Sequence, residues 1–210
     1  MDKKKIYVVY DRNVEDFALK LAEGRPAFPI IADEEHKTMD TVLAICRWLL
    51  AQGANRDAIV WAVGGGVTTD LVGFAASIYK RGVRYANYPT TLLSQVDAGV
   101  GGKTGVNLDG YKNMIGVTKF PVYTRILPEV LQTLPKRELR SGAAEMLKTF
   151  IIEDKGGHYE KAVKVLSEPE IDFAALAPLI EAAAEVKRRI VEQDSCIQLY
   201  RTYMRHIVPH

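Results

Sequence analysis

Apolar and polar residues follow one another along the first 90 positions in a pattern that predicts strands and helices in turn. Continuous apolar runs are typical of strands buried on both faces, whereas apolar residues three and four positions apart are typical of amphipathic helices. Strands are expected at 6–10, 29–32, 58–63 and 84–88, and helices at 14–21, 38–52 and 67–79. This alternation predicts a parallel sheet with right-handed crossovers, whose ligands bind at the carboxyl ends of the strands.

The second part of the chain has a different pattern. From about Pro135 onward the apolar spacing is helical, and no convincing strand interrupts it. Helices are expected at 136–152, 159–166 and 173–191. We therefore expect an α/β fold in which a Rossmann-like parallel sheet domain (1–130) is followed by the beginning of an α-helical domain (131–210).

Composition and charge narrow the function classes. The net charge is +2, and Lys and Arg are interspersed with Asp and Glu, which disfavours a nucleic-acid partner. No apolar run approaches the roughly 20 residues of a membrane helix, and the N-terminal segment lacks the apolar region of a signal peptide. These features predict a cytoplasmic protein without a membrane partner. The two cysteines, Cys46 and Cys196, are far apart, which indicates neither a disulfide framework nor a thiolate metal site.

Three consecutive glycines, at 64–66, follow the third expected strand and precede a helix. A diphosphate can approach such a turn because side chains are absent and a helix N-terminus offers free N–H groups. A tight structural turn is the alternative. Asp70, one turn into the helix, can accept hydrogen bonds from a ribose or nicotinamide group, or can serve only the helix dipole. Thr90 and Thr91 add two hydroxyls after the next strand, so a dinucleotide cofactor is the better interpretation.

Several ordered segments resemble the 3-dehydroquinate synthase family. They are GGGVTTDLVGFAA at 64–76, KRG at 80–82, PTTLLSQVD at 89–97, GGKTGVN at 101–107, KNMIG at 112–116, TLP at 133–135 and AEMLK at 144–148. The resemblance implies a lyase of the shikimate pathway, which leads to the aromatic amino acids. Such an enzyme uses NAD and Zn (or Co) to convert a phosphorylated seven-carbon keto acid (DAHP) to 3-dehydroquinate and phosphate. It also implies a homodimer.

The resemblance implies the site residues as well. NAD would be bound by Glu34, Lys37, Gly65, Gly66, Asp70, Thr90, Thr91 and Lys112. Substrate binding and catalysis would involve Arg81, Asp97, Lys103, Asn113, Lys148 and Lys187. Arg81 would meet the substrate phosphate, because a planar guanidinium suits a bidentate phosphate contact. For Glu34 and Lys37, a solvated charged loop is the alternative.

The implied metal ligands are Glu145 and, further on, His206. Without the resemblance, Glu145 and Lys148 would be interpreted as an i,i+3 ion pair on a helix. His206 and His210 keep an H-x-x-x-H spacing, so His206 could be the second ligand. A count from Lys187, however, moves both histidines out of register with the family motif. The choice between the two alignments, and between the two histidines as ligand, stays open. We expect the chain by itself to be incomplete for activity. The alternatives are another sugar-phosphate cyclase and a catalytically incomplete NAD-binding fragment.

Overall fold

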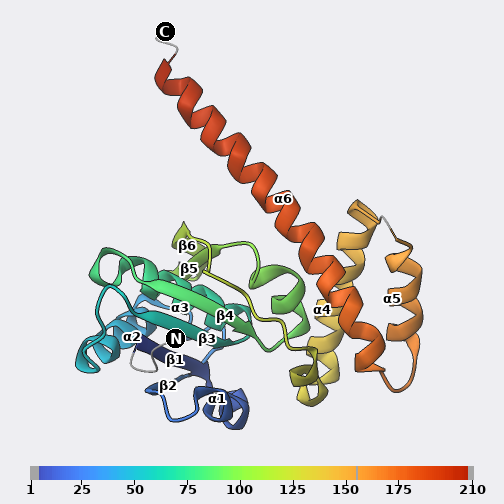
Figure 1. Ribbon diagram of the computed structural model, residues 1–210, viewed down its shortest axis with the longest axis horizontal. Coiled ribbons are helices and arrows are strands. Elements are labelled where there is room, and N and C mark those ends of the chain that lie inside the picture. The colour runs from blue at the N-terminus through green and yellow to red at the C-terminus, as the bar shows by residue number, and fades with distance from the viewer. Residues whose placement is uncertain (1–4, 155, 208–210) are drawn as a thin grey trace.

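The computed structural model describes residues 5–154 and 156–207, and side chains up to residue 193. Its first part is a parallel sheet in the strand order β2-β1-β3-β4, with helices on both faces (Figure 1). The strands are β1 (Ile6–Asp11), β2 (Ala27–Ile30), β3 (Ile59–Gly64) and β4 (Arg84–Pro89). The helices are α1 (Glu15–Ala22), α2 (Met39–Ala51) and α3 (Gly66–Ile78). The expected α/β class is confirmed.

The central strand β3 is buried on both faces, as its unbroken apolar sequence predicts. Val60 and Ala62 pack in a core shared with α2 and α3. Trp61 and Val63 point to the other face, where α1 covers the sheet. Period-2 alternation therefore divides one strand between two cores.

α2 lies within the predicted range 38–52, and local contacts fix its two ends. Thr38 is its N-cap, and the Thr38 hydroxyl accepts a hydrogen bond from the Thr41 N–H at 3.4 Å. Gly53 follows the helix at φ 70°, in the left-handed region that glycine adopts freely. The second strand was misplaced, because β2 begins two residues earlier than expected, at Ala27, where it pairs with Val8 of β1. Pro29 lies within β2, an edge strand, where a missing N–H is tolerated.

A β-hairpin that the apolar pattern did not predict follows the sheet. β5 (Lys103–Leu108) pairs antiparallel with β6 (Tyr111–Thr118). The signal was present, because Asp109 and Gly110 form the two-residue turn at φ 50° and 82°, and an Asp-Gly pair is typical of such turns. Close packing also needs glycine: a Cβ on Gly116 would lie 2.1 Å from the Thr104 carbonyl oxygen.

The last part is helical, as expected, and contains η5 (Pro128–Thr133), α4 (Lys136–Ile152), α5 (His158–Ser167) and α6 (Phe173–Ile207). Met146 and Phe150 of α4 pack with Leu176 and Ile180 of α6 in a separate core. α6 is longer than the predicted 173–191 and projects beyond the bundle (Figure 1). None of the described helices is long and apolar enough to cross a membrane.

Replacing Gly116 by alanine is expected to destabilise the fold, because the new methyl group must displace backbone of the opposite strand. Overpacking of this kind typically costs about 1–3 kcal/mol. At Gly101, a Cβ would find its nearest neighbour at 3.8 Å, so Gly101→Ala is the matched control, with an expected effect within about 0.5 kcal/mol. Urea unfolding of both variants measures the difference, and equal stabilities would contradict the packing described for the hairpin.

Candidate cofactor and substrate site

The glycine turn lies at the carboxyl end of β3 and begins α3. Gly65 is the N-cap of α3, and no side chain caps this helix end. The Gly64 carbonyl accepts a hydrogen bond from the Thr90 N–H at 2.9 Å, which fixes the turn to the end of β4. A Cβ on Gly65 would lie 3.1 Å from the Thr91 methyl group. The turn therefore presents backbone donors beside two threonines, an arrangement suited to an anion.

Lys37 brings three segments together next to this turn. Its side chain is 6% exposed, and its Nζ lies 2.5 Å from Asp70 Oδ2 in α3. The same ammonium donates to Asn113 Oδ1 of β6 at 2.6 Å. Burial raises the pKa of Asp70 above its ordinary value, although the hydrogen bond from Lys37 opposes that shift. Three of the predicted site residues are thus in contact, and Lys37 is not part of a solvated loop.

Glu34 lies at the outer edge of this cluster and is held by the hairpin. Asn107 Nδ2 donates to Glu34 Oε1 at 2.9 Å, and Lys112 Nζ lies 3.5 Å from the same oxygen. The hydrogen bond from Asn107, followed by the charges of Lys112 and Lys37, lowers the pKa of Glu34. Asn107 Oδ1 also accepts from the Asn113 N–H at 2.9 Å. Asn107, the last residue of the GGKTGVN segment, is not among the site residues predicted from the sequence.

A second group of predicted residues lies where the sheet meets the helical part. Thr91 Oγ1 and Ser94 Oγ lie 2.9 Å apart. Ser94 is the first residue of η4 (Ser94–Ala98), a single π-helical turn of a kind frequent at functional sites. Asp97 of η4 forms an ion pair with Lys187 of α6. This pair joins the two parts of the chain.

Glu145 and Lys148 lie on α4 and contact each other. Lys148 Nζ donates to Glu145 Oε1 at 2.8 Å, which raises the pKa of Lys148. The ion pair that the spacing alone indicated is therefore present. Within the part of the chain whose side chains are described, no three His, Cys, Asp or Glu residues form a metal-binding group. These residues do not fit a catalytic zinc site with three protein ligands. The expectations for His206 and His210 lie outside the described side chains.

Arg81 lies apart from the other predicted residues. It belongs to η3 (Tyr79–Arg81), which precedes β4, whereas the glycine turn lies at the opposite, carboxyl edge of the sheet. A six-residue strand spans roughly 20 Å. Lys80 and Arg81 have φ of 48° and 68°, which costs on the order of 1–2 kcal/mol per residue. Lys103, exposed at the start of β5, lies on the hairpin instead.

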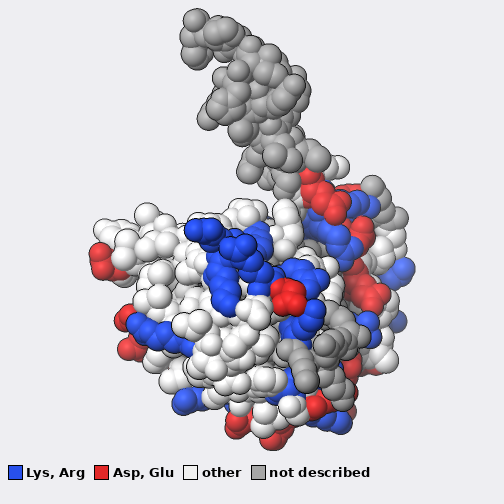
Figure 2. Space-filling view, turned by 60° about the vertical axis from the view of Figure 1, so that its left-hand side comes forward, with Lys and Arg blue, Asp and Glu red and all other residues white. Residues whose placement is uncertain are grey.

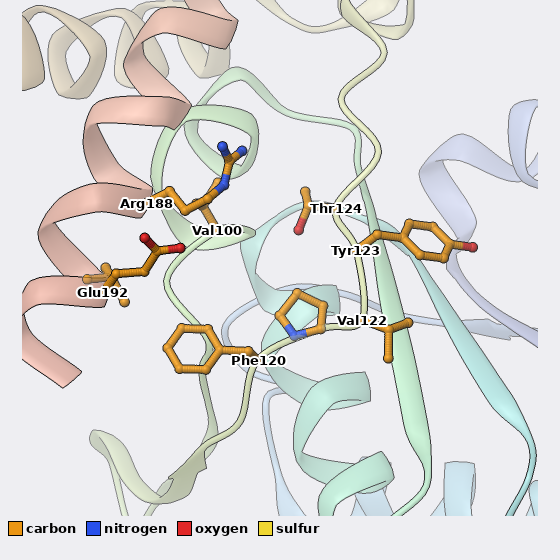
Figure 3. Close-up of a pocket in the computed structure, with 9 residues that line it drawn as sticks. Val100, Phe120, Val122, Tyr123, Thr124, Arg188 and Glu192 are labelled. Atoms are coloured by element: carbon orange, nitrogen blue, oxygen red, sulfur yellow. The ribbon is translucent and has the colours of Figure 1, made fainter. Parts of the chain in front are cut away.

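A separate cavity of about 630 Å³ lies between residues 120–124 and α6 (Figure 3). Its walls are formed by Val100, Phe120, Pro121, Val122, Tyr123, Thr124, Arg188, Val191 and Glu192. None of the predicted site residues lines it. Elsewhere on the surface, Figure 2 shows Lys and Arg side chains gathered near the middle of one face, with an acidic side chain among them and mixed charges towards the right and lower edges. Such a patch favours an anionic ligand.

Comparison with known proteins gives a decisive match. The family model described as 3-dehydroquinate synthase N-terminal matches residues 27–141, more than half of the chain. The chain belongs to the 3-dehydroquinate synthase family. The match covers the sheet from β2 onward, the glycine turn and the hairpin.

Individual relatives agree with this family. The chain is 40% identical over 188 residues to the 3-dehydroquinate synthase of Dictyoglomus thermophilum, covering 89% of this chain and 52% of the relative. It is 45% identical over 161 residues to that of Campylobacter concisus, covering 77% and 45%. The chain thus spans about half the length of these curated relatives.

A solved structure of the same architecture is 2-epi-5-epi-valiolone synthase from Streptomyces hygroscopicus, which has NAD+ and Zn2+ bound. It aligns with a TM-score of 0.76 and 32% identity over 90% of this chain and 56% of the other.

Replacing Lys37 by methionine is expected to lower the free energy of unfolding by about 1–3 kcal/mol, because Asp70, whose side chain is 21% exposed, would keep its charge without its partner. The loss should diminish as the pH falls, since protonation of Asp70 removes that charge. The double variant Lys37→Met/Asp70→Leu should recover part of the loss at neutral pH. Urea unfolding of the unmodified chain and of both variants at several pH values measures these effects. A double variant less stable than Lys37→Met would contradict the assigned ion pair.

Proposed function

We propose that this chain carries the NAD- and substrate-binding part of a 3-dehydroquinate synthase. This lyase of the shikimate pathway converts DAHP to 3-dehydroquinate and phosphate. The observation that carries the proposal is the uncapped N-terminus of α3 next to the contact of Lys37 with Asp70 and Asn113. A diphosphate needs backbone donors, and a ribose needs a nearby carboxylate, as in other dinucleotide sites of parallel sheets. The curated relatives support the same activity.

NAD fits this place, because Gly65 and Gly66 leave backbone donors open to its diphosphate. Asp70, oriented by Lys37, would accept from hydroxyl or amide groups, with Thr90 and Thr91 beside it. Glu34 and Lys112 would meet the second ribose. When bound, NAD would supply a reversible hydride acceptor, so that a substrate hydroxyl could be oxidised to a ketone, which acidifies the neighbouring C–H.

Cationic side chains would bind the substrate, which is both a carboxylate and a phosphate ester. Lys103, Lys148 and Lys187 supply the charge, and Asp97 holds Lys187 in place through their ion pair. Asn113 would present its amide to the substrate while its oxygen stays on Lys37. Zinc or cobalt remains the metal that the family implies. Among the described side chains, however, Glu145 belongs to no group of three possible metal ligands, and we assign no step to a metal.

Arg81 cannot serve the same cleft as the glycine turn of its own chain, because it lies at the opposite edge of the sheet. We therefore propose a homodimer in which Arg81 contacts substrate phosphate bound to the second copy. Sedimentation of the purified chain tests the dimer. The cytoplasmic location stays a prediction from the sequence.

Another sugar-phosphate cyclase is the second candidate, favoured by the likeness to 2-epi-5-epi-valiolone synthase. The two candidates differ in whether the substrate has a carboxylate. Calorimetry on the NAD-loaded chain should show DAHP binding more tightly than a sugar phosphate without a carboxylate. Lys103→Ala should remove most of that preference. Equal affinities for the two compounds would favour the second candidate, and phosphate release from DAHP measures turnover directly.

NAD binding is expected to weaken about tenfold or more in Asp70→Ala, because hydrogen bonds to a charged acceptor are each worth about 1.5–3 kcal/mol. Asp16→Ala is the matched control, since Asp16 is likewise an aspartate near the start of a helix but is exposed on α1. Calorimetry with NAD on the three proteins measures the effect. Unchanged affinity in Asp70→Ala would contradict the assigned cofactor site.

A further inference from the structure

Lys119 lies directly after β6, outside the residues assigned to cofactor or substrate. Its backbone is fixed at both ends: the Lys119 N–H donates to the Gly102 carbonyl at 2.8 Å, and its carbonyl accepts from the Tyr85 hydroxyl at 2.5 Å. Gly102 immediately precedes Lys103, the first residue of β5. The position of Lys119 is therefore tied to the base of the hairpin that presents Lys103.

The side chain of Lys119 reaches from the hairpin to the segment that carries Arg81. Its Nζ donates to the Val83 carbonyl at 2.8 Å and lies 3.4 Å from the Ala76 carbonyl. These two carbonyls lie on either side of residues 79–82, which we call the Arg81 loop. A Cβ on Gly82 would lie 3.5 Å from the same Nζ, so the ammonium also packs against this glycine.

The Arg81 loop has a strained backbone, which is closed by hydrogen bonds from the Gly82 N–H to the Tyr79 carbonyl and from the Val83 N–H to the Ala76 carbonyl, each at 2.8 Å, and to which Lys119 adds a side-chain restraint. Its residues 80, 81 and 82 have φ of 48°, 68° and 114° in succession. Positive φ at two consecutive residues that are not glycine persists only where the surroundings impose it. Lys119 provides such a restraint, because one cation holds the carbonyls before and after the loop together. A cation at this place also suits the last turn of α3, whose carbonyls carry partial negative charge.

Burial of the Lys119 ammonium is unfavourable by itself. Desolvation lowers the pKa of Lys119, in agreement with its partial burial. Its hydrogen bonds go to backbone carbonyls, which restrain the chain irrespective of the side chains nearby. An apolar residue of similar length would fill the same space without holding the loop.

We propose that Lys119 is a positioning residue that holds the Arg81 loop against the base of the hairpin and so fixes Arg81 for its contact with the phosphate of substrate bound to the second copy. This inference rests on the proposed function, because the contact of Arg81 with phosphate is part of it. Lys119 contacts neither cofactor nor substrate and acts through the backbone around Arg81.

The test compares Lys119→Met, Lys119→Arg, Arg81→Ala and the double variant Arg81→Ala/Lys119→Met with the unmodified chain. Calorimetry measures the affinity for DAHP at saturating NAD and, separately, the affinity for NAD. Lys161→Met is the matched control, because Lys161 also donates to a backbone carbonyl, that of Gly156, but on α5. If Lys119→Met does not fold, Lys119→Gln replaces it and is judged by the same outcomes.

Lys119→Met is expected to weaken DAHP binding at least about fivefold, since small displacements of a positioned group have large effects on binding and reactivity. NAD affinity should be unchanged, Lys119→Arg should restore DAHP affinity, and the double variant should bind DAHP no more weakly than Arg81→Ala. Equal losses of NAD and DAHP affinity, or additive losses in the double variant, would overturn the proposal, because general destabilisation would explain them. If Arg81→Ala weakens DAHP binding and Lys119→Met does not, only the role of Lys119 is wrong. If Arg81→Ala has no effect, the phosphate contact of Arg81 is wrong as well.

Discussion

The buried ammonium of Lys37 is the contact on which the arrangement of the candidate site depends. It joins the segment after β2 to α3 through Asp70 and to the hairpin through Asn113. A charge that is 6% exposed must be compensated where it lies, so these two partners cannot move independently of it. The carboxylate beside the glycine turn is therefore placed by residues that are distant in sequence.

Glycine permits the close packing that the hairpin needs to reach these partners. A Cβ on Gly73 of α3 would lie 2.4 Å from the Thr104 methyl group, so β5 can approach the helix only because that side chain is absent. The hairpin then lies along α3 and places Asn107 on Glu34 and Asn113 on Lys37. One wall of the site is thus formed by the hairpin and α3, which can pack closely because Gly73 has no side chain.

The sheet and its helices could be predicted because their signals are local. The apolar run of β3, the cap at Thr38 and the stop at Gly53 each act within a few residues. The hairpin was missed because β6 is exposed along most of its length and lacks an apolar pattern. The shift of β2 arose because its register is set by pairing with β1, which no local pattern records.

Site residues were likewise predictable where their signal is local and not where they depend on tertiary contacts. The glycine turn and Asp70 could be found from their place after a buried strand. Their contacts with Lys37, the role of Asn107 and the position of Arg81 at the other edge of the sheet depend on tertiary packing, which spacing along the sequence does not encode. The pairing of Glu145 with Lys148 is the exception, because helical periodicity alone indicates it.

The ion pair between Asp97 and Lys187 has a thermodynamic consequence for the two parts of the chain. Both side chains remain about 30% exposed, so dissolved salt weakens their attraction. An anion that draws Lys187 towards itself must compete with Asp97, and it thereby loosens a link between η4 and α6. By linkage, the factor by which the bound anion weakens this ion pair equals the factor by which the ion pair weakens binding of the anion. Ionic strength, anion binding and the strength of this link between η4 and α6 are therefore coupled through the carboxylate of Asp97.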